Sequence, residues 1–266
     1  MGLQTTGFEY VVALAGNPNT GKSTLFNALT GLRQHTGNWP GKTVTRAEGA
    51  FARAGRCYKL VDLPGTYSLL SASTDEEIAR DFILFGQPDC VVVVADATSL
   101  ERNLNLVFQV MEITSRTIVC VNLMDEARRR GITIDTDRLA DRLGVPVAGA
   151  SARTGEGVPQ LIDHVARVAT GEITPEPRLP KTPPRLEEAV RRMIPLIEEL
   201  APGLPNARWI AYRLIEGDHH IRQALEHGAL RRLSRARTVD AGAPPQHARA
   251  GHEAGPERPA LDWSRS

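Results

Sequence analysis

The sequence predicts an α/β fold in which a mostly parallel, six-stranded sheet is flanked by helices, with a small all-α domain after it. From Tyr10 onward, short runs rich in β-branched residues alternate with longer segments of helical period, which is typical of parallel strands joined by helices. A proline-rich segment at residues 173–184 separates this region from further helical patterns. With 266 residues, 41% of them hydrophobic, the chain is long enough for one large domain and a smaller one.

We expect the strands at residues 10–15, 44–51, 58–62, 90–95, 117–122 and 145–150. Most of them are apolar enough to be buried on both faces, as in sheets that helices cover on both sides. A helical run at 24–32 follows the first strand. A later helix carries one apolar stripe that we expect to pack against the sheet, formed by Leu104, Val107, Phe108 and Met111.

The predicted order is an α/β domain at residues 8–172, an extended linker at 173–184 and a helical domain at 185–233. Pro195 is expected to kink or split the first helix after the linker. Residues 234–266 hold scarcely any large apolar side chains, so we expect a disordered tail. The apolar stripe of that first helix consists of Leu186, Val190, Ile194, Ile197 and Leu200.

Composition argues against several classes of protein. Lysine and arginine number 32 against 31 acidic residues, so no global charge favours a nucleic-acid partner. No run approaches the roughly 18 apolar residues that cross a bilayer, and no export signal is visible, so we expect a soluble, cytoplasmic segment. Cys57, Cys90 and Cys120 lie in strand-like runs, which favours buried thiols over disulfides or a metal site.

The strongest motif directly follows the first strand and opens a helix. Backbone amides of such a loop surround phosphate oxygens, and the helix dipole favours the same anion. Lys22 would bridge the β- and γ-phosphates, and the Ser23 hydroxyl can bind Mg²⁺. The alternative, a chance glycine turn, is disfavoured by the strand before and the helix after. The motif and the residue after it are Gly16, Asn17, Pro18, Asn19, Thr20, Gly21, Lys22, Ser23 and Thr24.

A second motif, D-x-x-G, ends the third predicted strand as Asp62, Leu63, Pro64 and Gly65. Its carboxylate would reach Mg²⁺, and the glycine amide would meet the γ-phosphate. The motif alone is weak because many turns carry aspartate and glycine for conformational reasons. Its position one strand pair downstream of the phosphate loop favours the functional role.

Two further motifs end the fifth and sixth strands, at the sheet edge where ligands of open α/β sheets bind. An aspartate there can accept from both N1–H and the exocyclic amine of guanine but has the wrong polarity for adenine, and such sites discriminate by about 10⁴. This predicts GTP rather than ATP. Taken singly, Asn122 could be a strand-end cap and Ser151 a turn residue. The residues are Asn122, Leu123, Met124 and Asp125, then Ser151, Ala152 and Arg153.

The loop from Gly37 to Thr43 is a candidate switch, with an exposed-looking Trp39 between glycine and proline. The Thr43 hydroxyl would close over the metal and the γ-phosphate, so that the loop orders with GTP and loosens after hydrolysis. Gly41 and Lys42 belong to the same predicted site. Alternatively, Thr43 is the first residue of a strand.

These motifs resemble those of P-loop GTPases of the translation-factor type. More closely, they resemble the cytoplasmic N-terminal part of the ferrous iron transport protein B (FeoB) family. The resembling segments are G-N-P-N-T-G-K-S-T-L-F-N at 16–27, G-N-W-P-G-K-T-V at 37–44, D-L-P-G-T-Y-S-L at 62–69, N-L-M-D at 122–125 and S-A-R at 151–153. Residues 208–218 resemble the family's helical domain, and the resemblance covers roughly residues 8–230.

The resemblance implies a G domain and a helical, dissociation-inhibiting or spacer domain on the cytoplasmic side of the bacterial inner membrane. It would regulate Fe(II) uptake through a polytopic permease domain that this chain lacks. Implied partners are GTP and GDP, that permease domain and small cytoplasmic accessory proteins, with no nucleic acid. The resemblance also implies K⁺ held by Asn19 and backbone carbonyls around Trp39, Mg²⁺ held by Ser23, Thr43 and Asp62, and catalysis by Lys22, Thr43 and Asn19.

One departure concerns hydrolysis. Thr66 follows Gly65, where Ras-like proteins place the glutamine that orients water, so we predict slow turnover stimulated by K⁺. Leu123 and Arg153 replace the usual lysines, which should lower the affinity for the base.

Two other functions share the motifs: a soluble GTPase of ribosome or tRNA maturation, and a nucleotide-sensing module with negligible hydrolysis. The mixed charges of the helical region argue against the first, and Thr66 motivates the second.

Overall fold

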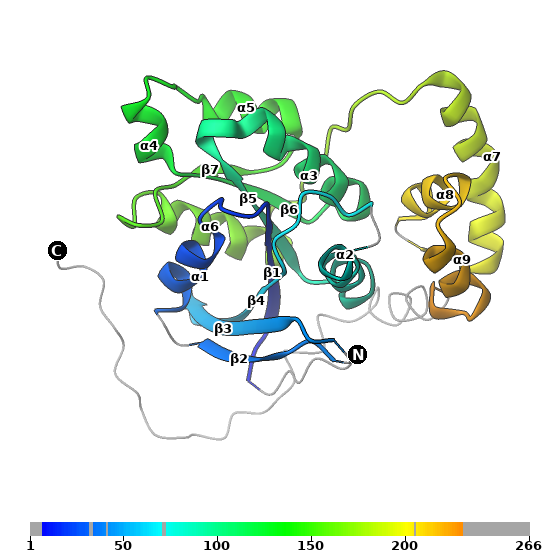
Figure 1. Ribbon diagram of the computed structural model, residues 1–266, viewed down its shortest axis with the longest axis horizontal. Coiled ribbons are helices and arrows are strands. Elements are labelled where there is room, and N and C mark those ends of the chain that lie inside the picture. The colour runs from blue at the N-terminus through cyan, green and yellow to red at the C-terminus, as the bar shows by residue number, and fades with distance from the viewer. Residues whose placement is uncertain (1–6, 32–33, 41, 71–72, 205, 231–266) are drawn as a thin grey trace.

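Figure 1 shows a computed structural model of the chain, in which an α/β domain lies beside a smaller unit of helices. The structure describes residues 7–31, 34–40, 42–70, 73–204 and 206–230. The predicted disordered tail at 234–266 lies outside these residues.

Within the described residues the sheet has seven strands, in the order β2-β3-β4-β1-β5-β6-β7. The pairs from β4 through β1, β5 and β6 to β7 are parallel, whereas β2–β3 and β3–β4 are antiparallel. The strands are β1 (Tyr10–Gly16), β2 (Gln34–Asn38), β3 (Thr45–Arg53), β4 (Arg56–Asp62), β5 (Cys90–Asp96), β6 (Thr117–Asn122) and β7 (Val147–Gly149).

The α/β class and six of these strands confirm the sequence prediction, and β2 is the strand that it missed. The sequence of β2, Q-H-T-G-N, has no apolar alternation, because this edge strand pairs only with β3 and buries no face against helices. The order of strands still places the carboxyl ends of β1, β5 and β6 at one edge of the sheet.

Helices cover both faces of the sheet (Figure 1). Alternate residues of β1 face opposite layers: Val12 and Leu14 pack with α1 and α6, whereas Val11 and Ala13 pack with α2 and α3. The helices are α1 (Lys22–Thr30), α2 (Thr74–Gly86), α3 (Leu100–Ile113), α4 (Met124–Arg129), α5 (Thr136–Leu143), α6 (Val158–Ala169), α7 (Pro184–Leu200), α8 (Ala207–Ile215) and α9 (His219–Glu226).

The predicted stripe on α3 packs on the core, although its centre is shifted. Val107 and Met111 are buried, whereas Leu104 and Phe108 are only partly buried. The other buried residues of α3 are Asn103, Leu106, Val110 and Ile113. The sequence pattern did not distinguish these neighbouring stripes because α3 has apolar residues on more than half of its surface.

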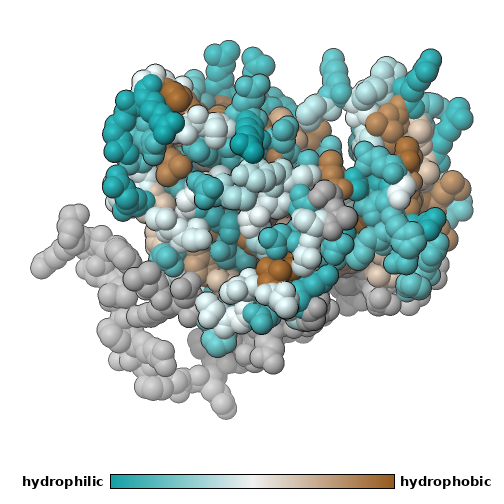
Figure 2. All heavy atoms as spheres, in the orientation of Figure 1, coloured by the Kyte–Doolittle hydropathy of each residue, from teal (hydrophilic) through white to brown (hydrophobic). Residues whose placement is uncertain are grey.

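The helical unit consists of α7, α8 and α9. Of the two outcomes expected at Pro195, a kink or a split, the split does not occur, since α7 runs through Pro195 to Leu200 as one helix. Val190 and Ile197 of the predicted stripe are buried, but Leu200 is 50% exposed. Leu200 and the exposed Leu196 contribute apolar surface to α7, on the side of the molecule where Figure 2 shows brown patches.

The connection from α6 to α7 carries no regular secondary structure between residues 174 and 183. Its backbone nevertheless docks on the end of α5. The amide of Glu176 donates to the Gly144 carbonyl at 2.9 Å, and the amide of Arg178 donates to that of Leu143 at 2.7 Å. The predicted linker is therefore extended and attached to the α/β domain over its first half.

Cys90 and Cys120 are buried as expected, but Cys57 is exposed. Cys57 lies near the start of β4, next to the β3–β4 turn, and the first two residues of β4 are exposed.

Within the part of the chain that the structure describes, no helix combines the length and apolar character that crossing a membrane requires.

Candidate nucleotide-binding site

The phosphate loop joins the end of β1 to the start of α1 and lines a cavity of about 280 Å³. Asn19 and Gly21 have positive φ angles of 66° and 76°, conformations that suit asparagine and glycine. Glycine is required at position 21 because a Cβ would lie 2.4 Å from Nδ2 of Asn122. The lining residues are Asn17, Pro18, Asn19, Gly21, Lys22, Ser23, Thr24 and Gly65.

The lysine and the carboxylate predicted to hold phosphate and magnesium contact each other in this structure. Lys22 forms an ion pair with Asp62, and its Nζ donates a hydrogen bond to the Leu63 carbonyl at 2.7 Å. Both side chains are mostly buried, and burial raises the pKa of Asp62 while Lys22 opposes that rise. A buried carboxylate needs a cationic partner. The Asp62 carboxylate therefore suits Mg²⁺ as a partner as well as it suits the Lys22 ammonium.

Asn122 connects the phosphate loop to the predicted base loop. Its Nδ2 donates to the Thr20 carbonyl at 2.9 Å, and its Oδ1 accepts from the Ala152 amide at 3.0 Å. The side chain is completely buried at the end of β6. The two loops are therefore held at a fixed separation by one side chain, which is more than a strand-end cap would do.

Asp125 is the second residue of α4. The N-cap residue of this helix is Leu123, which has a left-handed conformation with a φ of 63°. The Asp125 amide donates to Ser151 Oγ at 3.0 Å, which joins the two base motifs directly. Its carboxylate contacts Arg153 at 3.2 Å and Arg129 at 3.4 Å. The hydrogen bond from Arg153 is the main cause that lowers the pKa of Asp125, so the carboxylate stays ionised and able to accept.

A second contact, which the sequence analysis missed, also joins α4 to the base loop. Arg128 forms two hydrogen bonds to Glu156, at 2.7 and 2.6 Å, and Glu156 pairs through its backbone with Ser151. Neither residue belongs to a nucleotide motif, so only the folded arrangement identifies the pair.

Of the predicted site residues after Thr24, only Gly65 lines the cavity; the described residues of the loop at 37–43 do not, nor do residues 62–64, 122–125 and 151–153. Thr43 is exposed and precedes β3, and neither Thr43 nor Lys42 lines the cavity; Gly41 lies outside the described residues. The expectation of an exposed Trp39 is wrong, because Trp39 is only 4% exposed. Its carbonyl accepts from the Lys42 amide at 3.0 Å.

Thr66 is held by local contacts. Its hydroxyl donates to the Ser68 carbonyl at 2.6 Å, its amide donates to the Gly16 carbonyl at 3.2 Å, and the residue is buried. The side chain that replaces the glutamine of Ras-like proteins is therefore engaged in the turn after Gly65.

The α2 region also contacts the helical unit, through buried charges that the sequence analysis did not identify. Asp218 caps α9 and lies 2.8 Å from Arg213 and 3.6 Å from Arg80 of α2. Arg213 also donates to the Leu70 carbonyl at 3.1 Å. In the sequence these residues are only isolated charges within apolar helical stretches. Such charges are too common to indicate where a buried cluster will form.

Comparison with known proteins bears on the whole arrangement. The family model described as ferrous iron transport protein B matches residues 10–165, and the one described as the FeoB cytosolic helical domain matches residues 183–240. The chain belongs to the ferrous iron transport protein B family. The resemblance seen in the motifs is thereby confirmed, and with it a G domain of a GTPase family followed by a helical domain.

Curated relatives named Fe(2+) transporter FeoB include those of Salmonella typhimurium, 41% identical over 218 residues, and Escherichia coli K12, 39% identical over 227 residues. In both cases the match covers 80% of this chain and 28% of the relative. The chain thus spans little more than a quarter of the length of the relatives that it matches.

Solved structures of the family have the same fold. The cytosolic domain of T. maritima FeoB in its GMPPNP form is 34% identical with a TM-score of 0.75, covering 85% of this chain and 92% of that one. The cytosolic domain of L. pneumophila FeoB is 33% identical with a TM-score of 0.74, covering 90% and 94%. The FeoB G-domain from Methanococcus jannaschii is 46% identical with a TM-score of 0.54, covering 61% and 98%.

Proposed function

We propose that this chain binds GTP and hydrolyses it slowly, and that it regulates Fe(II) uptake through a membrane permease domain of the same protein. The observation that carries the proposal is the bridge made by Asn122, which holds the phosphate loop and the base loop in register. Both halves of a guanine nucleotide then have matching groups: backbone amides and Lys22 for phosphate, and Asp125 for the base. Family membership favours this function over a GTPase that acts on RNA.

In the proposed reaction the chain supplies position and charge. Lys22 leaves Asp62 and binds the β- and γ-phosphates, while Ser23, Asp62 and Thr43 hold Mg²⁺. When held there, Mg²⁺ would supply positive charge to the phosphate oxygens. Because the Thr66 side chain is engaged within its own turn, the attacking water is oriented by other groups, which accounts for the proposed slow turnover.

A monovalent cation completes the proposed site. The Asn19 side chain and backbone carbonyls of the Trp39 loop hold K⁺ beside the phosphates, where it supplies positive charge in place of an arginine finger. Asn19 lines the cavity in a left-handed conformation. The proposed location is the cytoplasmic side of a bacterial inner membrane, with small accessory proteins as further partners.

The test compares GTP hydrolysis in KCl and in NaCl at equal ionic strength, for the unchanged chain and for Asn19→Gly. Glycine keeps the positive φ but removes the amide, so the variant should keep GDP affinity and lose the stimulation by K⁺. Thr24→Ser, a mild change in the first turn of α1, serves as the control. Equal rates in the two salts for the unchanged chain would contradict the cation role, and no binding of guanine nucleotides would contradict the whole proposal.

A further inference from the structure

The turn formed by residues 65–70 lies between the phosphate loop and α3. On the side of the phosphate loop, the Thr66 amide donates to the Gly16 carbonyl at 3.2 Å, and a Cβ added to Gly65 would lie 3.5 Å from the backbone of Pro18. On the other side the turn contacts side chains of α3. Because Gly65 itself lines the phosphate cavity, the placement of this turn sets the position of one wall of the site.

Gln109 makes the deeper of the contacts from α3. Its Oε1 accepts from the Leu69 amide at 2.6 Å and from the Ser68 hydroxyl at 3.3 Å. The Ser68 hydroxyl oxygen accepts in turn from the Leu70 amide at 3.0 Å. Both groups that face Gln109 are donors, so its oxygen rather than its amide nitrogen points to the turn. Leu69 is only 1% exposed, so water is a poor substitute for this acceptor.

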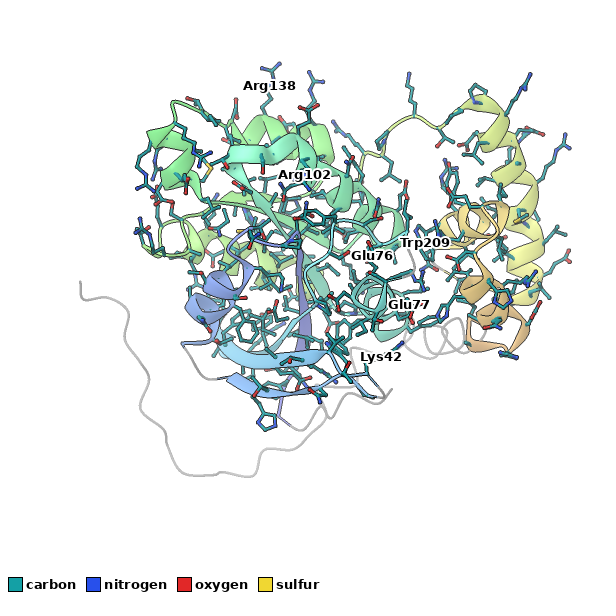
Figure 3. The ribbon with its side chains drawn as sticks, viewed as in Figure 1. Lys42, Glu76, Glu77, Arg102, Arg138 and Trp209 are labelled. Atoms are coloured by element: carbon teal, nitrogen blue, oxygen red, sulfur yellow. The ribbon has the colours of Figure 1, made fainter. Side chains whose placement is uncertain are left out.

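A second contact comes from a residue two helical turns earlier, on the same face of α3. The Arg102 guanidinium lies 4.6 Å from the centroid of the Tyr67 ring. Arg102 belongs to the first turn of α3 (Figure 3), and the Tyr67 side chain is 48% exposed. This contact therefore lies at the surface, whereas Gln109 reaches the buried part of the turn.

These contacts matter for hydrolysis because the turn can offer little but backbone to a triphosphate. The Thr66 hydroxyl is used within the turn, where it donates to the Ser68 carbonyl at 2.6 Å. What remains is the Gly65 amide, which the D-x-x-G motif assigns to the γ-phosphate. A backbone donor stabilises developing charge best when it is fixed in place before the reaction. The acceptor that fixes the following residues is Gln109.

We propose that Gln109 is a positioning residue for GTP hydrolysis, which holds the turn at 65–70 through the Leu69 amide and thereby places the Gly65 amide at the γ-phosphate. The proposal rests on the proposed function, since it assumes that GTP is the substrate. GDP has no γ-phosphate, so Gln109 contributes to the turnover of GTP and not to the affinity for GDP. Gln109 lies outside every nucleotide motif of the sequence.

The first test measures kcat for GTP and Kd for GDP in three variants. Gln109→Met has a similar length but no oxygen acceptor, so kcat should fall about 3- to 10-fold while Kd for GDP stays the same. Gln109→Glu keeps an oxygen acceptor and should keep most of the rate. Asn105→Met is the control, a polar-to-methionine change at an exposed position of α3 that should alter neither quantity. An unchanged kcat in Gln109→Met, a parallel loss of GDP affinity, or an equally slow Gln109→Glu would overturn the proposal.

The second test measures the contact without nucleotide. Hydrogen exchange followed by NMR should show the Leu69 amide protected in the unchanged chain and in Gln109→Glu, and exchanging at least about 10-fold faster in Gln109→Met. The reference is the Val119 amide of β6, which donates to the Pro146 carbonyl and should exchange alike in all three. Unchanged exchange at Leu69, or equal acceleration at Val119, would overturn this inference alone. Failure of the unchanged chain to bind guanine nucleotides would overturn the proposed function with it.

Discussion

The ion pair between Lys22 and Asp62 joins two residues that the motifs assign to different ligands. Each neutralises the other in a mostly buried position, so neither charge is left without a partner. When a triphosphate and Mg²⁺ bind together, the phosphates would replace Asp62 as the partner of Lys22, and Mg²⁺ would replace Lys22 as the partner of Asp62. Neither buried charge is then left without a partner. This arrangement predicts that the two residues contribute to stability as well as to binding.

Lys22→Ala should abolish triphosphate binding and also lower the free energy of unfolding by about 2 kcal/mol, because the buried Asp62 carboxylate loses its cation. Adding Asp62→Asn to that variant removes the unpaired charge and should restore part of the stability without restoring binding. Urea denaturation without nucleotide and calorimetry with GTP measure the two effects separately. A double variant no more stable than Lys22→Ala would contradict the argument.

At the same scale, the phosphate and base motifs could be located in the sequence because each is short and local, and the roles of their residues stay predictions. Burial of Trp39 was not, since the Phe82 ring that covers it comes from a helix far along the chain. The exposed Cys57 shows the opposite error: it belongs to a strand, as predicted, but the first two residues of β4 are exposed because they lie beside the β3–β4 turn.

At the scale of elements, the site depends on how the ends of β1 and β6 are connected. Asn122 makes that connection with two hydrogen bonds from a completely buried amide. Replacing it leaves the Thr20 carbonyl and the Ala152 amide unpaired, and each such group costs about 1–3 kcal/mol when buried.

Asn122→Ala should therefore destabilise the chain by about 2–4 kcal/mol and weaken GDP binding at least about 10-fold, because the two loops lose their fixed separation. Asn103→Ala is the control: Asn103 is a buried asparagine of α3 that donates to the Ser99 carbonyl, outside the nucleotide site. It should lower stability while leaving the affinity for GDP intact. Fluorescent GDP titration and urea denaturation distinguish the two, and equal losses of affinity would contradict the role of Asn122.

Strands buried on both faces were predicted well because their apolar runs are unambiguous, and β5 and β6 are examples. The β2 strand was missed because residues 35–38 are exposed and, among the described residues, its pairing with β3 makes it a strand. Pro195 does not split α7, since packing of α7 against α8 through buried Val190 and Ile197 outweighs the loss of one backbone donor.

At the scale of the whole molecule, the G domain and the helical unit share a buried charge cluster centred on Asp218. Burial opposes ionisation of this carboxylate, but the Ile221 amide and the arginines outweigh it and hold its pKa below the ordinary value. A depressed pKa means that the ionised group stabilises the fold above pH of about 4 and that this stabilisation is lost on further acidification. The cluster therefore ties the segment at Leu70, which follows the D-x-x-G motif, to α8 and α9 at neutral pH.

Asp218→Asn should keep the cap of α9, because asparagine is an equally good capping residue, while leaving Arg80 and Arg213 without their shared counter-charge. We expect the free energy of unfolding to fall by about 3 kcal/mol at pH 7, and the difference from the unchanged chain to shrink below a pH of about 4. Asp81→Asn, at a more exposed acid that also contacts Arg80, should change stability little. Urea denaturation at several pH values measures both, and equal effects would contradict the assignment.

The docking of Glu176 and Arg178 on the end of α5 also limits how far apart the two units can move. Only residues 179–183 remain between the last of these backbone contacts and the first residue of α7. Five residues span at most about 17 Å when fully extended. Any nucleotide-dependent displacement that preserves these contacts therefore keeps the start of α7 within about 17 Å of Arg178.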